Sequence, residues 1–227
     1  MRRGRAALAL TLLGPAAARP LAAGDIAKAV VILEAQAQSV PGDVPKAAPA
    51  RFVLMEDGTV FVGGTSRVLT ARLDGADLKA LDRRLDGVRK LPGLGGTVAL
   101  GPGAGSYRLL LRKGRPIDMQ ITGDPAQATG SLRALADLLR DLSRFNHSAL
   151  QPYQPAQYAM SAFASTLVGG CRPWTFPDPP EGLAFAPRVV DAASVRGWPT
   201  GATPASVCAG DKRYAVALRP LLPGETP

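Results

Sequence analysis

Residues 52–62, FVLMEDGTVFV, contain two apolar runs that are separated by the dipeptide Asp57-Gly58. Both runs are rich in the β-branched and aromatic residues that favour strands. Because Asp-Gly adopts the positive φ angles of a two-residue type I′ turn, the stretch predicts a tight β-hairpin. This hairpin makes an antiparallel sheet the expected centre of the fold.

The segments on either side of the hairpin contain further candidate strands. Each is short, apolar or alternating, and bounded by turn residues such as Gly and Pro. The expected strands are AVVILEAQ at 29–36, VLTARL at 68–73, TVAL at 97–100, YRLLLR at 107–112 and IDMQIT at 117–122. A turn at Lys113-Gly114 joins the last two of them.

Two segments carry apolar residues at helical spacing. The first, 75–91, is followed by Pro92-Gly93, and Asp74 stands where an N-cap is needed. The second is the Leu-rich segment 131–145. The apolar stripes consist of Leu78, Leu81, Leu85 and Val88 in the first, and of Leu132, Leu135, Leu138, Leu139 and Leu142 in the second. Both segments are therefore expected to form amphipathic helices.

The composition of the chain changes after Phe145, because residues 146–187 are rich in proline. Strands are still expected within 156–168 and 209–222. Pro220 either ends the second of these strands or places it at a sheet edge, since proline lacks the N–H that a central strand donates.

Cys171 and Cys208 are the only two cysteines of the chain. An even pair in an exported protein predicts a disulfide. Closing a loop of 37 positions would stabilise the fold by roughly 3–4 kcal/mol in the chain-entropy model. The bond would tie the start of the proline-rich loop to the entry of the last strand.

These elements predict an α+β fold with a mostly antiparallel sheet, two amphipathic helices and a proline-rich, disulfide-tied C-terminal section. The expected organisation is a signal peptide at 1–23, an α+β domain at 24–150 and a C-terminal section at 151–227 that packs on it. We expect the mature chain to be a monomer.

The N-terminus has the order of a secretory signal peptide. A basic stretch, MRRGR at 1–5, precedes the short apolar stretch AALALTLLG at 6–14 and a region of small residues at 15–23. Cleavage is expected after Ala23, with Ala18 as the alternative site. The protein is therefore predicted to be secreted, periplasmic or located in the cell envelope.

The net charge of +9 depends partly on this leader. Four arginines leave with residues 1–23, so 23 bases and 18 acids remain and the mature charge is +5. The remaining bases are scattered, which argues against a nucleic-acid partner. Apolar stretches fall short of the ~18 residues that a membrane span needs, so no transmembrane segment is expected in the mature chain.

Familiar catalytic arrangements are not apparent in the sequence. His147 is the only histidine, and its place after the Leu-rich helix suggests a role at the helix C-terminus or on the surface. The glycine-rich segment GPGAGS at 101–106 precedes an expected strand. Because a phosphate-binding glycine loop leads into a helix, this segment is expected to be a flexible loop that does not bind phosphate. We therefore expect no catalytic residue, no metal ligand and no cofactor.

Four carboxylates are candidates for acid–base pairs, and the two in the proline-rich loop are also candidates for a calcium site. They are Asp118 and Asp124 at a strand end, and Asp178 and Glu181 in the proline-rich loop. Glycoside hydrolysis needs two carboxyl groups that face each other across a cleft, and calcium needs several oxygen ligands that alternate along a loop. The spacing of these residues favours neither arrangement.

Trp174 and Phe176, in CRPWTFPD at 171–178, are the best candidates for an exposed binding surface. Aromatic side chains on a disulfide-braced loop are typical of binding hot spots. The alternative is that both rings roof the core under the loop.

Several stretches resemble an uncharacterised family of secreted or lipoprotein-like bacterial proteins. They are FVLMEDGTVFV at 52–62, LDGADLKALDRRL at 73–85, WPTGATP at 198–204 and RYAVALRPLLPGE at 213–225. The RPLLPGE element is the most specific of them, and it contains no residues that suggest chemistry. This chain lacks the lipidation cysteine of the lipoprotein members, and the resemblance implies no activity. Residues 52–142 are also faintly similar to the emfourin protease inhibitors in the order of strands and helices.

These observations favour a secreted, non-catalytic binding or inhibitor-like protein whose partner is another extracytoplasmic protein. Two alternatives stay open. One is a secreted hydrolase that uses carboxylates, and the other is a structural component of the cell envelope.

Overall fold

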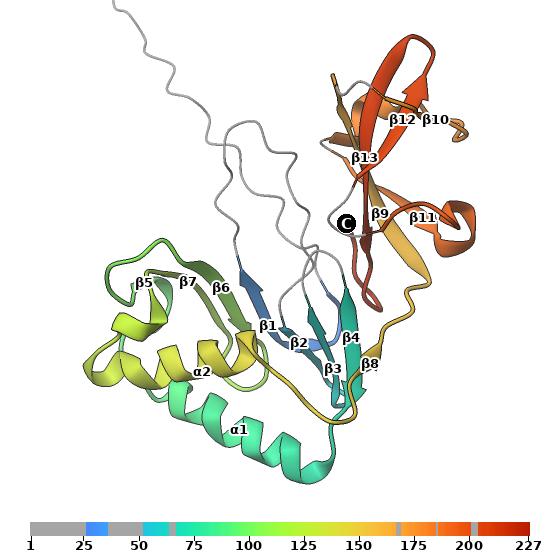
Figure 1. The fold of residues 1–227 in the computed structure, drawn as a ribbon. Coiled ribbons are helices and arrows are strands. Elements are labelled where there is room, and N and C mark those ends of the chain that lie inside the picture. The colour runs from blue at the N-terminus through green and yellow to red at the C-terminus, as the bar shows by residue number, and fades with distance from the viewer. Residues whose placement is uncertain (1–25, 36–51, 64–66, 167–168, 185, 201–203) are drawn as a thin grey trace, which may run out of the picture.

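The computed structural model describes residues 26–35, 52–63, 67–166, 169–184, 186–200 and 204–227 (Figure 1). Over these residues the fold is α+β, with two α-helices, two mostly antiparallel sheets and one disulfide. The predicted signal peptide at 1–23 lies outside the described residues. Within the described part of the chain, none of the helices has the length and apolar character that crossing a bilayer requires.

The first sheet has eight strands in the order β5-β7-β6-β1-β2-β3-β4-β8. All neighbours are antiparallel except β5 and β7, which are parallel. The strands are β1 (Ala29–Ala35), β2 (Phe52–Met55), β3 (Thr59–Gly63), β4 (Val68–Arg72), β5 (Gly96–Ala99), β6 (Ser106–Leu111), β7 (Ile117–Thr122) and β8 (Gln151–Pro152). Because β8 pairs with β4, the first two residues of the predicted C-terminal section belong to this sheet.

The predicted hairpin is present, but its turn is not of type I′. Of the loop residues only Gly58 has a positive φ, at 84°. The N–H of Gly58 donates to the carbonyl of Met55 over 3.1 Å, so three residues form the connection. In such a loop only the last residue needs the left-handed conformation. Asp57 instead accepts hydrogen bonds from the backbone and the hydroxyl of Thr59, both at 3.0 Å.

Two helices, α1 (Gly75–Arg89) and α2 (Arg133–Ser143), lie together on one face of this sheet (Figure 1). The carboxylate of Asp74 caps α1 as predicted, because it accepts from the N–H groups of Ala76 and Asp77 at 2.8 and 2.9 Å. The helix expected at 131–145 begins with a 3₁₀ turn, Gly130–Leu132, before α2.

The alternation of the strands gives the first sheet two apolar faces. Buried residues of the helix-facing side form one core together with the buried residues of both helices; they include Leu33, Phe52, Val60, Leu85, Leu109, Leu135 and Leu139. The opposite side has its own cluster, which includes Ile26, Ile32, Val53, Phe61 and Val68. This second face therefore also needs a cover.

The second sheet has five strands in the order β10-β12-β13-β9-β11. The strands are β9 (Gln157–Ala164), β10 (Arg172–Pro173), β11 (Arg188–Asp191), β12 (Ala205–Ala209) and β13 (Lys212–Pro220). Tyr214, Val216 and Leu218 occupy alternate positions of β13, which point to one face of a strand, and all three lie buried in the core of the sheet. Pro220 is the last residue of β13, which is a central strand, so the proline ends the strand and does not mark a sheet edge.

The residues after β13 leave the second sheet and pack on the uncovered face of the first. Leu222 joins the cluster around Ile26, and Glu225 forms an isolated β-bridge with Ile26. The hydroxyl of Tyr153 donates to the carbonyl of Leu221 over 3.0 Å. The C-terminal residues therefore connect the two sheets.

An ion pair between Arg219 and Glu225 fixes this connection. The two side chains are 7% and 1% exposed, and Arg219 Nη1 donates to Glu225 Oε1. The second carboxylate oxygen accepts from the N–H of Leu222 over 2.9 Å. The RPLLPGE element, which contains no evident chemistry as a sequence, thus carries a buried pair of charges.

Removing the negative charge should destabilise the protein strongly. We expect Glu225→Gln to lower the free energy of unfolding by roughly 3–5 kcal/mol, because Arg219 then stays buried without the carboxylate that it contacts. Thermal unfolding followed by calorimetry measures the change.

Asp141→Asn is the matched control for this variant. Asp141 pairs with Arg84 at 2.5 Å, but the two side chains are 49% and 60% exposed. We expect its loss to cost less than about 1 kcal/mol. Equal effects of the two substitutions would show that the buried pair does not stabilise the fold in this way.

Candidate binding surface

The disulfide between Cys171 and Cys208 is present as predicted, with the two Cα atoms 5.6 Å apart. It joins the residue before β10 to β12. The two strands also pair in parallel, with Arg172 opposite Val207 and Pro173 opposite Cys208. Covalent and hydrogen-bonded links therefore hold the beginning of the proline-rich loop against the second sheet.

Three aromatic side chains lie in contact next to the disulfide-braced loop: Trp174 and Phe176 from the loop itself, and Trp198 from a later segment. The ring centroids of Trp174 and Phe176 are 5.1 Å apart, and those of Phe176 and Trp198 are 5.8 Å apart. Arg172 stacks over Trp198 with its guanidinium carbon 5.1 Å from the ring centroid, and Arg188 lies 5.9 Å from that of Phe176. We call these five residues the aromatic–arginine cluster.

Hydrogen bonds orient the members of the cluster. The indole N–H of Trp174 donates to the carbonyl of Asp178 over 2.7 Å, and Arg188 donates to the Asp178 carboxylate over 2.5 Å. Arg172 donates to the carbonyl of Gly197 over 3.1 Å. Because Trp174 and both arginines are already held by hydrogen bonds, binding of a partner here would cost little side-chain entropy.

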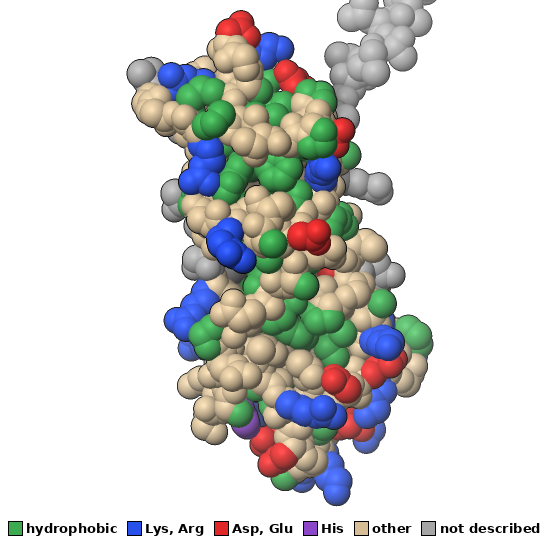
Figure 2. All heavy atoms as spheres, turned by 90° about the vertical axis from the view of Figure 1, so that its right-hand side faces the viewer, with side chains coloured by type: hydrophobic (Ala, Val, Ile, Leu, Met, Phe, Trp, Pro, Cys, Tyr) green, Lys and Arg blue, Asp and Glu red, His purple; other side chains and the backbone are tan. Residues whose placement is uncertain are grey.

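The three rings are half-buried. Their inner sides pack against the core of the second sheet, which includes Met160, Val190, Val207 and Val216. The rings therefore roof the core and still present part of their surface. Figure 2 shows hydrophobic side chains lying among Lys and Arg side chains on the upper part of the face that it draws.

A tyrosine–carboxylate pair supports the same loop from β13. The hydroxyl of Tyr214 donates to Glu181 Oε1 over 2.6 Å, and Lys212 Nζ lies 3.3 Å from the same oxygen. Glu181 belongs to the 3₁₀ helix Pro180–Ala184. This hydrogen bond raises the pKa of Tyr214 to about 12 and lowers the pKa of Glu181.

Of the two roles expected for His147, the surface location fits a side chain that is 25% exposed, whereas the ring contacts α1 instead of the C-terminus of the Leu-rich helix. Its Nε2 lies 3.0 Å from the carboxylate of Asp77 in the first turn of α1. Its Nδ1 accepts from the N–H of Ala149 over 3.2 Å, so Nε2 carries the proton and donates to Asp77. The ring also stacks on Phe145. A partner 70 positions away could not be found from helical spacing.

The four carboxylates considered from the sequence have separate partners. Asp118 binds Arg108 at 2.8 and 3.1 Å, and this hydrogen bond lowers its pKa. Asp124 accepts from the N–H of Ala126 and caps a short 3₁₀ helix. Asp178 and Glu181 bind Arg188 and Tyr214, as described above. These contacts give each of the four carboxylates a structural role.

The carboxylates expected from the sequence do not include Glu34, a titratable residue on β1. Its carboxylate lies 3.8 Å from Arg108, and the side chain is 12% exposed. Burial raises the pKa of Glu34, while Arg108 opposes the shift. A glutamate within the apolar run AVVILEA is the signal that could have identified it.

The glycine-rich segment at 101–106 is a packing contact. A Cβ atom on Gly123 would lie 2.1 Å from the carbonyl oxygen of Gly101, and one on Gly103 would lie 2.7 Å from the N atom of Asp124. The segment leads into β6 and not into a helix, as expected. Among the described residues, no group of three His, Cys, Asp or Glu side chains could hold a metal ion.

Comparison with known proteins adds no further assignment: no family model, no curated protein and no solved structure matches this chain.

The Tyr214–Glu181 pair should make stability depend on pH in the alkaline range. In the unfolded chain the tyrosine loses its proton near its ordinary pKa of 10, whereas in the folded protein it does so near 12. The contribution of the pair is therefore complete below pH 10 and is lost as the pH rises from 10 to about 12. Nuclear magnetic resonance of ¹³C-labelled tyrosine rings measures the titration directly.

Glu181→Ala should return the pKa of Tyr214 towards 10, while Asp178→Asn in the same loop should leave it near 12. A Tyr214 that titrates near 10 in the unaltered protein would contradict the hydrogen bond.

Proposed function

We propose that this protein is an exported, non-catalytic binding protein that recognises another extracytoplasmic protein through the aromatic–arginine cluster. Residues 1–23 would act as its signal peptide, and the mature chain would be a monomer without a nucleic-acid partner. The observation that carries the proposal is a preorganised group of three half-buried rings and two stacked arginines beside the disulfide-braced loop.

The composition of the cluster supports a protein partner. Tryptophan and arginine are enriched among the residues that dominate binding energies at protein interfaces. Arginines that already stack on Trp198 and Phe176 keep N–H groups for acceptors on a partner. The same stacking covers parts of the ring faces, which makes a sugar that stacks on these rings a less suitable ligand.

An inhibitor of an extracytoplasmic protease is the specific form of this function that we favour. The supporting features are the rigid loop and the faint similarity of residues 52–142 to emfourins. A stoichiometric loss of activity of a co-secreted protease on addition of the purified protein would support it.

One observation favours a secreted hydrolase as the second candidate. Glu34 and Asp118 both contact Arg108, yet the pKa of Glu34 is raised and that of Asp118 is lowered. Carboxyl groups whose pKa values are pushed apart are typical of acid–base catalysis. If this candidate is correct, the protein hydrolyses a substrate, and the substitution Glu34→Gln abolishes that hydrolysis.

Photocrosslinking can identify what the cluster contacts. A photoreactive residue at the exposed Thr175, between Trp174 and Phe176, should crosslink the native partner in intact cell envelopes. The same residue at the exposed Lys79 on α1 is the matched control. A crosslinked protein specific to position 175 supports the proposal, whereas linkage to peptidoglycan would favour the cell-envelope component.

Affinity for that partner should depend on the rings. We expect Trp198→Ala and Phe176→Ala each to weaken binding at least about thirtyfold, the effect of losing a hot-spot side chain. Val189→Ala, which removes an exposed apolar side chain outside the cluster on β11, should bind as the unaltered protein does. Calorimetric titration measures the affinities, and circular dichroism checks that each variant is folded. Equal affinities for all three variants would refute the role of the cluster.

A further inference from the structure

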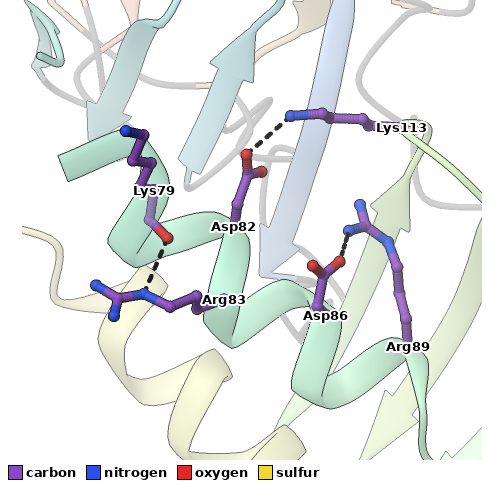
Figure 3. Close-up of polar contacts among 6 residues, drawn as sticks. All are labelled: Lys79, Asp82, Arg83, Asp86, Arg89 and Lys113. Carbon is purple, nitrogen blue, oxygen red and sulfur yellow. Dashed lines mark hydrogen bonds and ion pairs between the residues drawn. The ribbon is translucent and has the colours of Figure 1, made fainter. Parts of the chain in front are cut away.

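Arg89, the last residue of α1, has an unusual environment next to the β6–β7 turn. Its side chain is 13% exposed, and Nη1 donates to Asp86 Oδ1 over 2.7 Å. Its Nε and Nη2 atoms are buried and have no hydrogen-bond partner among the described residues. Figure 3 shows Arg89 with the neighbouring charged residues Asp82, Asp86 and Lys113.

Two buried donors without acceptors are costly, and the cost is higher when they belong to a cation. Such groups in a folded protein therefore require an explanation, of which a bound ion is one. The Nε–H and Nη2–H bonds lie on one edge of the planar guanidinium. That edge is a fork that binds two oxygens of a carboxylate or phosphate in parallel. Asp86 uses Nη1 and leaves both donors of the fork unpaired.

The β6–β7 turn approaches this edge through a glycine. Gly114 has a φ of +75°, and a Cβ atom there would lie 4.0 Å from Arg89 Nε. Because residue 114 is a glycine, the turn places no side chain of its own at this position beside Nε. Lys113, Gly114 and Arg115 are all exposed, so an outward displacement of the turn would disturb no core residue.

Lys113 brings a second cation to the same place. Its Nζ lies 2.8 Å from Asp82 Oδ2, and Asp82 stands one helical turn before Asp86 on α1. In Figure 3, Lys113 and Arg89 both point into the space between α1 and the β6–β7 hairpin, whereas Arg83 points away from it. The two ion pairs hold both cations in position before any ligand binds.

The local charge selects the ligand. Arg89, Lys90, Lys113 and Arg115 supply four positive charges in two adjoining segments, and Asp82 and Asp86 supply two negative ones. The excess of two positive charges matches a dianion better than a carboxylate. Because the C-terminal end of a helix repels anions, these side chains must supply the attraction.

We propose that Arg89 and the turn at 113–115 form a binding site for a dianionic tetrahedral oxyanion, either phosphate or sulfate, free or as a group on a larger molecule. The anion enters by outward displacement of the turn and accepts hydrogen bonds from Nε and Nη2 of Arg89. Lys113 and Arg115 balance its charge. The site is separate from the aromatic–arginine cluster and does not depend on the function proposed for it.

The ¹⁵N resonances of arginine side chains test the proposal on the full, unaltered chain. Inorganic phosphate, sulfate and acetate are titrated separately, with sodium chloride added to keep the ionic strength constant. We expect one arginine Nε–H resonance, which is missing in Arg89→Lys, and the amide of Gly114 to shift with saturation on addition of phosphate or sulfate. If neither resonance shifts, or if acetate binds as tightly as the dianions, the proposal is wrong.

Two lysine substitutions on the same helix separate this site from general attraction of anions. Arg89→Lys keeps the charge but removes the fork, so phosphate affinity measured by calorimetric titration should fall about tenfold or more. Arg83→Lys is the matched control, since Arg83 donates to the carbonyl of Lys79 at 3.3 Å and lies outside the site. Arg89→Lys that binds phosphate as tightly as Arg83→Lys would overturn the assignment.

Discussion

The buried ion pair of Arg219 and Glu225 determines how the two sheets are joined. Charges inside a protein are tolerated when each finds its partner and its remaining hydrogen bonds. Glu225 meets this condition by binding Arg219 with one oxygen and the N–H of Leu222 with the other. The pair closes the chain into a compact turn that places Leu222 on the outer face of the first sheet, beside Ile26.

This junction gives the proposed binding surface its support. β13 begins at Lys212 and ends at the junction, at Pro220. Its neighbour β12 contains Cys208 of the disulfide. The aromatic–arginine cluster therefore stands on a sheet that is covalently braced at one end and anchored to the first sheet at the other (Figure 1). A partner that binds the cluster would meet a surface whose ordering cost has already been met in folding.

Local patterns in the sequence predict most of the elements but few of the contacts between them. The hairpin at 52–62, the Asp74 cap, both helices and the disulfide follow from short-range spacing and from the cysteine count. The type of the turn at Gly58 depends on the register of the two strands, which sets the number of residues in the loop. The partner of His147 is Asp77 on α1, far from it in the sequence. The unpaired fork of Arg89 is likewise a property of the packed structure alone, because the turn beside it lies 25 positions away in the sequence.

Urea unfolding followed by two probes tests directly whether the sheets form one unit. Both tryptophans, Trp174 and Trp198, pack on the second sheet, whereas α1 and α2 pack on the first. Tryptophan fluorescence therefore reports the second sheet, and circular dichroism at the helical band reports mainly the first. Coincident midpoints for the full chain are expected if Arg219 and Glu225 couple the sheets. Two separate transitions would contradict that account.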